Sequence, residues 1–397
     1  MKVAILGWGV DSQDVEPWLR AQGHKITILD EKEKPFGDLS TYDMLVRSPG
    51  VYRYRKELKE LKKPSITSKI KLFFDACPGK IIGVTGTKGK GTTSTLIYEI
   101  LKKAGKKVFL GGNIGKGIFG DLDKMDSESW VVLELSSFQL IDLHKSPHIA
   151  VVLMTTLDHL DWHVNQDEYI NAKCQITKNQ RSNDFTIYNK DYPNSVKIGL
   201  QGEGQKIAVS KEDWTKPLRL RGDHNRENMA AAAAVAQILD IRSQIVEEVA
   251  RDFKGLEHRL EEVATVGGVT YFDDSFSTVP ETTIAAIKAF SEPMILIAGG
   301  SEKGSDFTEL GKVISASCNL KAVILIGLMA DRIDKAILNR HLRIIRNLSN
   351  LNDVVRTASN LAESGDVVVL SPACASFDMF KSYKDRGDQF KACVRSL

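Results

Sequence analysis

Short apolar runs alternate with helix-forming stretches along most of the sequence, and this alternation limits the fold more than any other feature. The runs occupy residues 2–7 (KVAILG), 25–30, 44–51, 80–86, 107–112, 130–135 and 149–156, and later 269–275, 294–300, 322–327 and 366–373. Runs with little polar alternation are typical of strands that are buried on both faces. Because helical stretches separate them, they predict parallel sheets with crossover helices and therefore an α/β fold.

The runs fall into three series, which predict three domains. With 397 residues the chain is too long for one ordinary core. We place a Rossmann-like domain at 1–78, a P-loop ATPase-like domain at 79–255 and a second Rossmann-like domain at 256–397. The basic stretch 52–70 (YRYRKELKELKKPSITSKI) is interpreted as a solvated helix face and a linker. The alanine-rich segment 223–241 predicts a helix.

Composition gives little support for a macromolecular or membrane partner. The 54 basic and 51 acidic residues leave a formal charge of +3, which favours neither nucleic acid nor a membrane surface. The five cysteines show no CxxC spacing, so they predict reduced thiols rather than a zinc site or disulfides. The N-terminus lacks the features of a signal peptide, and no apolar segment approaches membrane-spanning length. We expect a cytoplasmic protein that acts on small molecules.

The loop GVTGTKGKGTTST at 83–95 follows an apolar run and precedes a helix, as a phosphate-binding loop does. Glycines let backbone N–H groups approach phosphate oxygens, and a lysine reaches the outer phosphates. Two positions depart from the general motif, because Val84 replaces the first glycine and Gly91 replaces the hydroxyl residue after Lys90. The candidate ATP-binding residues of the loop are Gly86, Thr87, Lys88, Gly89, Lys90, Gly91, Thr92 and Thr93. Thr92 and Thr93 each offer a hydroxyl for Mg²⁺.

GWGVDS at 7–12 resembles the start of a dinucleotide fingerprint, but Ser12 stands where the third glycine belongs. Gly9 lies in this turn, and Asp30 ends the next apolar run at a suitable distance for a ribose or base contact. Three interpretations stay open: an NAD site, a tight turn without a ligand, and a nucleotide-sugar site.

Acidic and histidine residues follow two runs of the central series. Glu134 ends one run, where a carboxylate can bind Mg²⁺ directly or form an ordinary ion pair. The segment 158–163 (DHLDWH) follows another run, and its aspartates and histidines favour metal or phosphate chemistry over surface polarity. Lys173 lies on the next predicted helix, where a lone lysine by default faces solvent.

Further polar residues fall at run ends and helix starts in the second half of the chain. Asn225 and Asn228 share one helix face, where their amides can meet a purine edge or cap the helix. Arg259 and Asp274 suit a triphosphate and its ribose, or a structural ion pair. Lys303 follows a glycine turn, and Ser376 precedes a predicted helix that it can cap; together they suit a substrate carboxylate.

These motifs, in this order, resemble the Mur ligases, which are ATP-dependent amide ligases of peptidoglycan synthesis. The family has a shorter phosphate loop, GTxGK, which Gly86, Thr87, Gly89 and Lys90 reproduce. Within the family, this chain resembles the branch that adds D-glutamate. The similar segments are GGNIG at 111–115, LELSSFQL at 133–140, DHLDWH, HNRENMAAA at 224–232 and SPACASFD at 371–378. The resemblance implies addition of D-glutamate to UDP-N-acetylmuramoyl-L-alanine through an acyl phosphate, with ATP and Mg²⁺ as cofactors. The alternative function is that of a related Mur or folylpolyglutamate-type ligase that adds a different amino acid.

The resemblance also implies roles for particular residues. The first domain, with Gly9 and Asp30, would bind UDP, and Asn113 would contact the UDP-sugar. Glu134, His159 and Lys173 would serve Mg²⁺, with Lys173 carbamylated, beside a hydroxyl of Thr92 or Thr93. Lys90, His159 and Lys173 would be catalytic. The residues implied for ATP, besides the loop, are Asn225, Asn228, Arg259 and Asp274. Those implied for D-glutamate are Thr278, Lys303, Ser376, Phe377 and Tyr383. The chain departs from the family pattern at Gly91, at Phe276, where the pattern has lysine, and in its short N-terminal domain. We expect a monomer.

Overall fold

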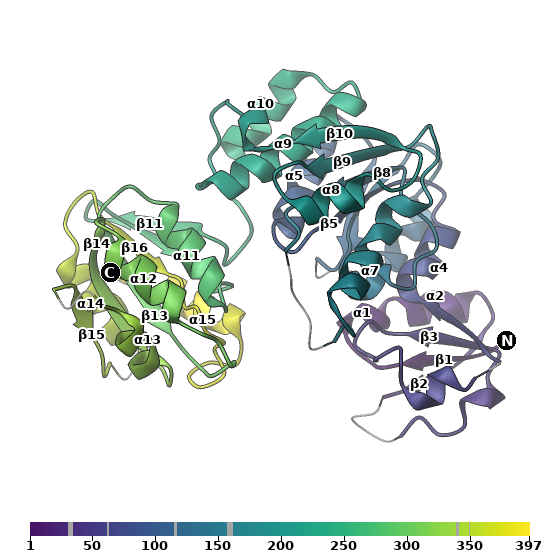
Figure 1. Ribbon diagram of the computed structural model, residues 1–397, viewed down its shortest axis with the longest axis horizontal. Helices are drawn as coiled ribbons and strands as arrows, with labels where there is room; N and C mark the ends of the chain where they lie inside the picture. The colour runs from purple at the N-terminus through teal and green to yellow at the C-terminus, as the bar shows by residue number, and fades with distance from the viewer. Residues whose placement is uncertain (31–34, 62, 115–116, 157–161, 339–340, 349) are drawn as a thin grey trace. The chain divides into compact units, whose positions relative to one another are not determined.

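The computed structural model describes residues 1–397 with the exception of 31–34, 62, 115–116, 157–161, 339–340 and 349. It contains three sheets with helices packed against them (Figure 1). Among the described strands every pairing is parallel except that of β11 with β12. The predicted parallel α/β fold is therefore confirmed.

The first sheet has the strand order β2-β1-β3-β4. Its strands are β1 (Lys2–Leu6), β2 (Lys25–Leu29), β3 (Met44–Arg47) and β4 (Ser65–Ser68). The helices of this part are α1 (Val10–Gln13), α2 (Val15–Ala21), α3 (Lys56–Lys59) and α4 (Lys69–Ala76).

The interpretation of residues 52–70 as a helix face and a linker was wrong for the second half of this stretch, where a strand lies instead of a linker. This stretch contains α3 and then β4, which pairs with β3 so that Ile66 lies beside Leu45 and Thr67 beside Val46. The strand was missed because lysines and Pro64 precede it and only four residues form it. Its β-branched residues, Ile66 and Thr67, were the available signal.

The second sheet has the order β10-β9-β8-β5-β7-β6. Its strands are β5 (Lys80–Thr85), β6 (Val108–Gly112), β7 (Trp130–Glu134), β8 (Ile149–Val152), β9 (Phe185–Asn189) and β10 (Gln205–Val209). The helices are α5 (Lys90–Lys103), α6 (Ser137–Leu140), α7 (Gln166–Lys178), α8 (Pro193–Gly199), α9 (Asp223–Ile238) and α10 (Ser243–Asp252). The helix predicted at 223–241 is thus present as α9.

The first two sheets share one hydrophobic core. It joins Val3 and Ile5 of β1 to Val131 and Leu133 of β7 within a single cluster of buried side chains. Phe119, in the segment between β6 and β7, packs its ring 5.0 Å from that of Trp18 on α2 and 5.6 Å from that of Phe73 on α4. An ion pair between Arg47 at the end of β3 and Asp142 after α6 adds a polar link, with Nε 3.0 Å from Oδ2.

The third sheet has the order β11-β12-β16-β13-β14-β15. Its strands are β11 (Glu261–Val266), β12 (Val269–Asp273), β13 (Met294–Gly299), β14 (Leu320–Ile326), β15 (Arg343–Ile345) and β16 (Val367–Leu370). The helices are α11 (Pro280–Lys288), α12 (Thr308–Ala316), α13 (Ala330–Ala336), α14 (Leu351–Leu361) and α15 (Tyr383–Arg395). Separate apolar clusters cover its two faces, so this part has a core of its own.

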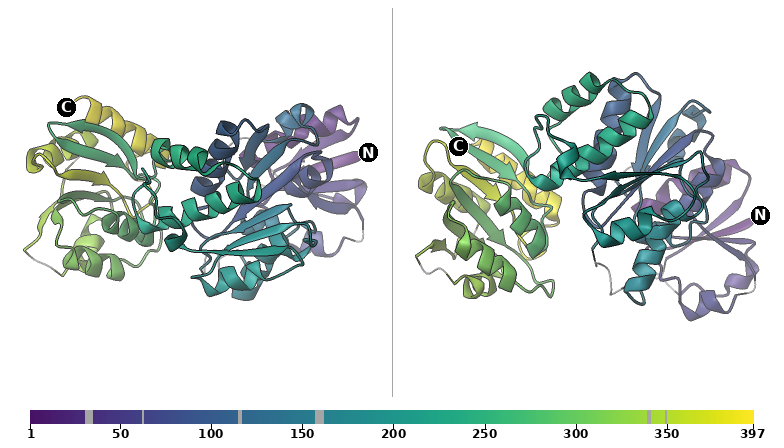
Figure 2. Two further views of the ribbon diagram at one scale, coloured as in Figure 1. Left: turned by 90° about the horizontal axis from the view of Figure 1, so that it is seen from above. Right: turned by 45° about the horizontal axis from the view of Figure 1, so that its top comes forward.

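The chain divides into two compact units (Figure 2). Unit 1 comprises residues 1–218 and 224–251 with the first two sheets, and unit 2 comprises residues 219–223 and 252–397 with the third. All five cysteines are free thiols. Of the helices that the structure describes, none has the length and apolarity to cross a membrane.

Candidate active site

The glycine-rich loop joins the end of β5 to the start of α5. β5 ends at Thr85 and α5 begins at Lys90, so the strand, turn and helix expected of a phosphate loop are present. The backbone N–H of Thr87 donates to the carbonyl of Met154, just after β8, at 2.7 Å. This bond holds the loop at the carboxyl edge of the sheet, where the N–H groups of the first helical turn can receive an anion.

Two glycines of the loop have no room for a side chain. Gly89 has a φ of +86°, and a Cβ on it would collide with Oδ1 of Asn228. A Cβ on Gly86 would lie 2.9 Å from the Cβ of Leu153. The loop therefore packs its backbone directly against α9 and the end of β8.

The Lys90 ammonium lies over the loop. Its Nζ donates to the carbonyls of Gly86 at 3.0 Å and Thr87 at 3.2 Å. Lys88 is exposed, whereas Gly91, Thr92 and Thr93 are buried. The cationic group thus lies against the backbone of the turn.

The two asparagines of α9 approach the same loop. Asn228 donates from Nδ2 to Oδ1 of Asn225 at 3.0 Å and accepts at Oδ1 from the Thr93 hydroxyl at 3.2 Å. Both asparagines are buried. The Thr93 hydroxyl therefore links the start of α5 to α9.

Lys173 is buried beside the loop rather than facing solvent. It is 2% exposed, and its Nζ donates to Oγ1 of Thr85 at 3.2 Å and to the carbonyl of Gly86 at 3.0 Å. One helical turn earlier on α7, the hydroxyl of Tyr169 lies 2.8 Å from Oγ1 of Thr87. α7 thus contacts the phosphate loop through two side chains, and the default interpretation of Lys173 as a surface residue was wrong.

Glu134 is the last residue of β7 and is 5% exposed. Its Oε1 accepts from Nδ2 of Asn113 at 3.1 Å, and its carbonyl accepts from the Asn113 backbone at 2.9 Å. Asn113, expected to contact the sugar substrate, therefore stands next to the carboxylate expected to bind Mg²⁺.

The histidine-aspartate segment is described only in part. His159, Asp158 and Asp161 lie outside the described residues. His163 is buried, its Nε2 lies 3.0 Å from Oγ of Ser137, and its ring stacks on Phe138 with 5.6 Å between centroids. This histidine packs within the core of unit 1.

Besides the Arg47–Asp142 ion pair, a polar contact joins the loop after β3 to α7. The hydroxyl of Tyr54, after β3, donates to Oε1 of Glu168 on α7, whose Oε2 accepts from the backbone of Val164 at 2.8 Å. Tyr52 stacks edge-on against Trp162 at 5.7 Å. The loop after β3 is therefore attached to the helix that bears Lys173.

Gly9 and Asp30 lie at the carboxyl edge of the first sheet. Gly9 directly precedes α1, and Oδ2 of Asp30 accepts from the backbone N–H of Trp8 at 3.3 Å. The two predicted residues are thus brought together at the turn after β1.

In unit 2, Asp274 and Arg259 lie at the end of β12. Asp274 is 5% exposed; its Oδ2 accepts from the Ser371 hydroxyl at 2.7 Å and its Oδ1 from the Leu260 backbone at 3.2 Å. Burial raises the pKa of Asp274 to about 7, although hydrogen bonds from Ser277 and Ser371 oppose the rise. The Arg259 guanidinium lies 3.8 Å from the ring centre of Phe276.

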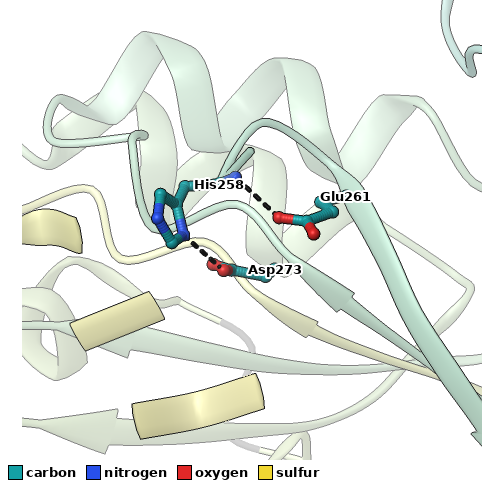
Figure 3. Close-up of side chains that lie close together, drawn as sticks. All are labelled: His258, Glu261 and Asp273. Carbon is teal, nitrogen blue, oxygen red and sulfur yellow. Dashed lines mark hydrogen bonds and ion pairs between the residues drawn. The ribbon is translucent and has the colours of Figure 1, made fainter. Parts of the chain in front are cut away.

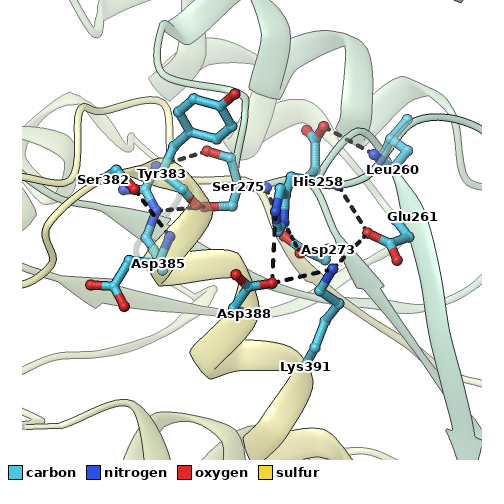
Figure 4. A network of polar contacts seen from close by, with 12 residues as sticks. His258, Leu260, Glu261, Asp273, Ser275, Ser382, Tyr383, Asp385, Asp388 and Lys391 are labelled. Carbon is cyan, nitrogen blue, oxygen red and sulfur yellow. Dashed lines mark hydrogen bonds and ion pairs between the residues drawn. The ribbon is translucent and has the colours of Figure 1, made fainter. Parts of the chain in front are cut away.

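Next to them, His258 joins the segment before β11 to β12. Its Nδ1 lies 2.7 Å from Oδ2 of Asp273, and its backbone N–H donates to Glu261 at 2.9 Å (Figure 3). Ligand atoms of these three residues lie within 4.8 Å of one another, close enough for a metal ion. However, Nζ of Lys391 lies 3.2 Å from Oε2 of Glu261 (Figure 4), and an ammonium group repels a metal ion. We interpret the group as a structural clamp, which the sequence did not predict.

Arg386 connects two loops of unit 2 from the inside. It is fully buried, and its guanidinium donates to the hydroxyl and carbonyl of Ser275 at 2.9 Å each. It also donates to the carbonyls of Cys374 at 3.2 Å and Ala375 at 3.3 Å. Burial lowers the pKa of Arg386 to about 10, which leaves it charged near neutrality. The loop after β12 and the loop after β16 are thus held by one side chain.

The residues predicted for the amino acid lie on the loops after β12, β13 and β16 and at the start of α15. Ser301, two residues before Lys303, forms an isolated bridge with Ala375, and its hydroxyl accepts from the backbone of Phe377 at 3.1 Å. Phe377 is 76% exposed, and Lys303 is also exposed. Thr278 follows Phe276 on the loop after β12, and the Tyr383 ring lies 5.0 Å from the Phe276 ring.

Of the two roles that the sequence allows for Ser376, the helix cap is not the one that the structure contains. Residues 376–380 form a turn, in which the Phe380 backbone donates to the Ser376 carbonyl at 2.9 Å. The following helix, α15, begins at Tyr383 and is capped by Ser382, whose Oγ accepts from the Asp385 backbone at 3.2 Å. Ser376 is therefore not engaged as a cap, although it is 2% exposed.

Comparisons with known proteins agree with this geometry. A family model for the Mur ligase middle domain matches residues 84–216, and one for the Mur ligase glutamate ligase domain matches 258–374. UDP-N-acetylmuramoylalanine–D-glutamate ligase from Clostridium botulinum strain 657 is 34% identical over 447 aligned residues, covering 100% of this chain and 97% of the relative. The chain belongs to the Mur ligase family. The ligase of the same name from Symbiobacterium thermophilum is 33% identical and is covered to 98% of its length.

Solved Mur ligase structures share the fold. The alanine ligase MurC from Thermotoga maritima has a TM-score of 0.64 at 16% identity, covering 100% of this chain and 99% of that one. MurF from the same organism, solved in complex with ADP, has a TM-score of 0.63 at 18% identity and covers 89% and 90%. At these identities the similarity shows the fold of the Mur ligases and no more.

Several residues around the site of this Mur ligase were missed in the sequence. Tyr169, Tyr54 and Glu168 contact one another or the loop only through tertiary packing. Arg386 lies within an ordinary-looking helix. The one usable signal was the spacing of Tyr169 and Lys173, four residues apart and therefore on one helix face.

We expect the stability of this Mur ligase to fall as the pH rises through the pKa of Asp274. Its carboxyl has a pKa of about 7 when folded against 3.8 ordinarily, so the folded chain holds the proton more tightly. The resulting stabilisation is complete below the ordinary pKa and is lost as the pH rises through the folded value. At full effect it amounts to about 4 kcal/mol.

Chemical denaturation of wild type and Asp274→Asn between about pH 4.5 and about pH 8 measures this dependence. We expect the free energy of unfolding to fall more steeply with pH in the wild type, because the asparagine does not titrate. The same pH dependence of the free energy of unfolding in both proteins would contradict the raised pKa of Asp274 as its cause.

Proposed function

We propose that this chain joins D-glutamate to the alanyl carboxylate of UDP-N-acetylmuramoyl-L-alanine with consumption of ATP, as a step of peptidoglycan synthesis. The observation that carries the proposal is the 33–34% identity, over the whole chain, to ligases named for this reaction. The phosphate loop in unit 1 and the buried polar loops in unit 2 supply chemistry that the reaction requires.

The reaction has two steps. A carboxylate oxygen of the alanyl group attacks the γ-phosphorus of ATP, and the bond to the bridging oxygen breaks to release ADP and leave an acyl phosphate. The amine of D-glutamate then attacks the acyl carbon, a C–N bond forms, and phosphate leaves as the C–O bond breaks and the amine loses a proton. Both reactants of the first step are anions, so catalysis requires positive groups where their charges meet.

Lys90 and the N-terminus of α5 meet that requirement. The Lys90 ammonium lies at the loop carbonyls of Gly86 and Thr87, and the helix presents backbone N–H groups to the same place. We propose that residues 86–93 hold the phosphates, and that Asn225, Asn228, Arg259 and Asp274 also contact ATP. The bond from Thr93 to Asn228 supports this grouping for the residues of unit 1.

Residues beside the loop fit a magnesium ion. Glu134 offers a carboxylate at a strand end and Thr92 a hydroxyl at the helix start, and Mg²⁺ prefers oxygen ligands. We propose that these two residues, with His159 and Lys173, hold Mg²⁺, which when bound neutralises charge on the phosphates.

The role of Lys173 requires a change of charge, because an ammonium group repels Mg²⁺. We propose that its amine adds to CO₂, so that an N–C bond forms, a proton is released and an anionic oxygen ligand results. The contacts of Nζ with Thr85 and the Gly86 carbonyl support this proposal, because they bring the amine next to the phosphate loop.

Removal of dissolved CO₂ is therefore expected to lower turnover several-fold, and added bicarbonate is expected to restore it. Phosphate release in degassed buffer measures the effect. The residual activity of Lys173→Ala serves as control, since it has no amine to modify and should not respond. Turnover that is indifferent to CO₂ in the wild type would contradict carbamylation.

Each of the three predicted domains is assigned one substrate. We propose that residues 1–78, with Gly9 and Asp30, bind the UDP moiety, that Asn113 contacts the sugar, and that residues 79–255 bind ATP. Residues 256–397 would receive D-glutamate through Thr278, Lys303, Ser376, Phe377 and Tyr383. The isolated bridge of Ser301 with Ala375 supports the last group, because it holds the Lys303 and Ser376 loops side by side.

Phosphate release with UDP-N-acetylmuramoyl-L-alanine, ATP and a panel of D- and L-amino acids tests the function. We expect strict dependence on D-glutamate. Stimulation by a different amino acid alone would assign the chain to another ligase of this fold.

We also propose that the enzyme is a cytoplasmic monomer. The nucleotide-linked substrate and ATP support the location. Sedimentation at assay concentration and cell fractionation would reveal an oligomer or a different compartment.

A further inference from the structure

We propose that a cavity in unit 1 binds a phosphate group, either the free ion or one carried by a small molecule. The cavity has a volume of about 200 Å³ and is lined by residues of β3, β4, α3, α4 and the segments that follow β3 and α6. Its charged and titratable lining residues are Arg47, Arg53, Lys71, Asp142 and His144. None of them is assigned to a substrate in the proposed function, so the inference does not rest on that function.

Arg47 is the buried cation of this cavity. Its side chain is 2% exposed, and its Nε donates to Oδ2 of Asp142 at 3.0 Å. Nη1 of Arg53 lies 3.4 Å from Oδ1 of the same carboxylate and donates to the carbonyl of Ile141 at 3.1 Å. A single carboxylate therefore serves two guanidinium groups. Because a buried charge without full compensation is unfavourable, this arrangement favours a further anion beside it.

Lysines add to the positive charge. Nζ of Lys71 lies 2.9 Å from Oδ2 of Asp75, and Nζ of Lys145, which follows His144, lies 2.5 Å from Oδ1 of the same aspartate. In these ion pairs two carboxylates, Asp75 and Asp142, serve four cations, which leaves a surplus of two positive charges. A phosphate group carries about −1.5 to −2 charges near neutral pH, so its charge matches the surplus.

The donors around the cavity suit a tetrahedral oxyanion. The Arg53 guanidinium lies over the Tyr54 ring, 5.2 Å from its centre. A stacked guanidinium keeps its N–H groups in its own plane, where two of them can bind one phosphate. The side chains of Arg53 and Lys71 are 32% and 35% exposed, so an anion can reach both from solvent.

The volume of the cavity limits the occupant to a small one. It is several times the roughly 30 Å³ that one water takes in the liquid. It is also below the roughly 300 Å³ at which pockets for drug-sized ligands begin. Leu58 and Ile66 form an apolar part of the lining, against which a short carbon chain can pack. A phosphate ion or a short phosphate ester therefore fits, whereas a nucleotide is too large.

Calorimetric titration of the full chain with inorganic phosphate at low ionic strength tests the site. We expect Arg53→Met and Lys71→Met each to weaken binding at least about 5-fold, because each removes a charged donor. Asp142→Asn is expected to tighten binding about 3-fold or more, because it removes the carboxylate that competes for the two arginines. Lys56→Met is the matched control, since this exposed lysine of α3 lies outside the lining, and it should leave the affinity unchanged.

Two further measurements define the ligand and the fold. Glycerol phosphate in place of phosphate shows whether the cavity prefers an ester or the free ion, and acetate is expected to bind at least about 10-fold more weakly than either. Denaturant unfolding without phosphate should show that the variants fold. Phosphate that binds at the glycine-rich loop is indifferent to these substitutions and appears equally in all variants.

Phosphate affinity that is unchanged in both Arg53→Met and Lys71→Met would overturn the inference. A loss of affinity in Asp142→Asn at unchanged free energy of unfolding would also overturn it, and so would acetate that binds as tightly as phosphate. Failure of the proposed function would show in the amino-acid panel and not in these titrations, which contain neither ATP nor an amino acid.

Discussion

Replacement of Lys90 by alanine is expected to lower turnover by a factor of at least about 10²–10³, equivalent to about 3–4 kcal/mol of transition-state stabilisation. In the proposed reaction two anions, a carboxylate and a triphosphate, meet at the loop, and the Lys90 ammonium lies within 3.2 Å of two carbonyls of that loop. The backbone N–H groups and the other cations stay in the variant, so a small residual rate should persist.

The structure separates this catalytic effect from misfolding. Lys90 is only partly buried and bonds to two carbonyls at the surface of the turn, so we expect the free energy of unfolding to change by about 1 kcal/mol or less. Lys106→Ala is the matched control, because this exposed lysine follows the other end of α5. Phosphate release and denaturant unfolding should be measured on both variants. Turnover of Lys90→Ala within about threefold of wild type would contradict the proposal that this loop binds the phosphates of ATP.

Arg386→Met is expected to destabilise the chain by about 3 kcal/mol and to lower the affinity for the amino acid. Methionine fills much of the volume, but it leaves the buried carbonyls of Ser275, Cys374 and Ala375 without the donors that the guanidinium supplies. The desolvation of the arginine, seen in its lowered pKa, offsets part of the loss. Both loops that Arg386 joins carry residues proposed for the substrate, so the two effects should appear together.

Two further variants sharpen this test. Arg386→Lys keeps the charge but lacks the planar fork, so it should recover little of the stability. Arg395→Met alters an exposed arginine at the end of the same helix, α15, and should unfold like the wild type. Guanidinium chloride unfolding compares all three. A loss below about 1 kcal/mol in Arg386→Met would show that the two loops hold without it.

The sequence predicted those parts of the structure that depend on local pattern. The apolar runs became strands because parallel strands buried on both faces need nearly continuous apolar residues. Glycines before a helix marked the phosphate loop, and the spacing of Asn225 and Asn228 placed both on one face of α9, where they bond to each other. Strand β4 escaped because four residues after a proline carry almost no periodic signal.

The remaining parts of the site depend on contacts between segments far apart in the chain. Apart from its spacing from Tyr169, nothing near Lys173 indicates that it is buried, because its partners Thr85 and Gly86 lie at the end of β5 and just after it. Arg386 is charged and helical, which predicts a surface residue. Its acceptors lie elsewhere in the chain, however: Ser275 is 111 residues away, and Cys374 is 12 residues away in the loop after β16. The sequence allowed a cap at Ser376 as one of two roles, because the turn between 376 and 380 was not recognised.

The close packing of Gly86 and Gly89 bears on how an inhibitor of this enzyme could be evaded. A bacterium escapes a drug most readily by changing a residue that the drug touches, provided that the target still folds and works. At Gly89 even a methyl group would strike Asn228, and at Gly86 it would crowd Leu153. A compound that draws its affinity from the backbone of this turn would therefore meet a surface with few viable escape mutations. A compound that relies on exposed side chains outside the site would lose its affinity through substitution far more easily.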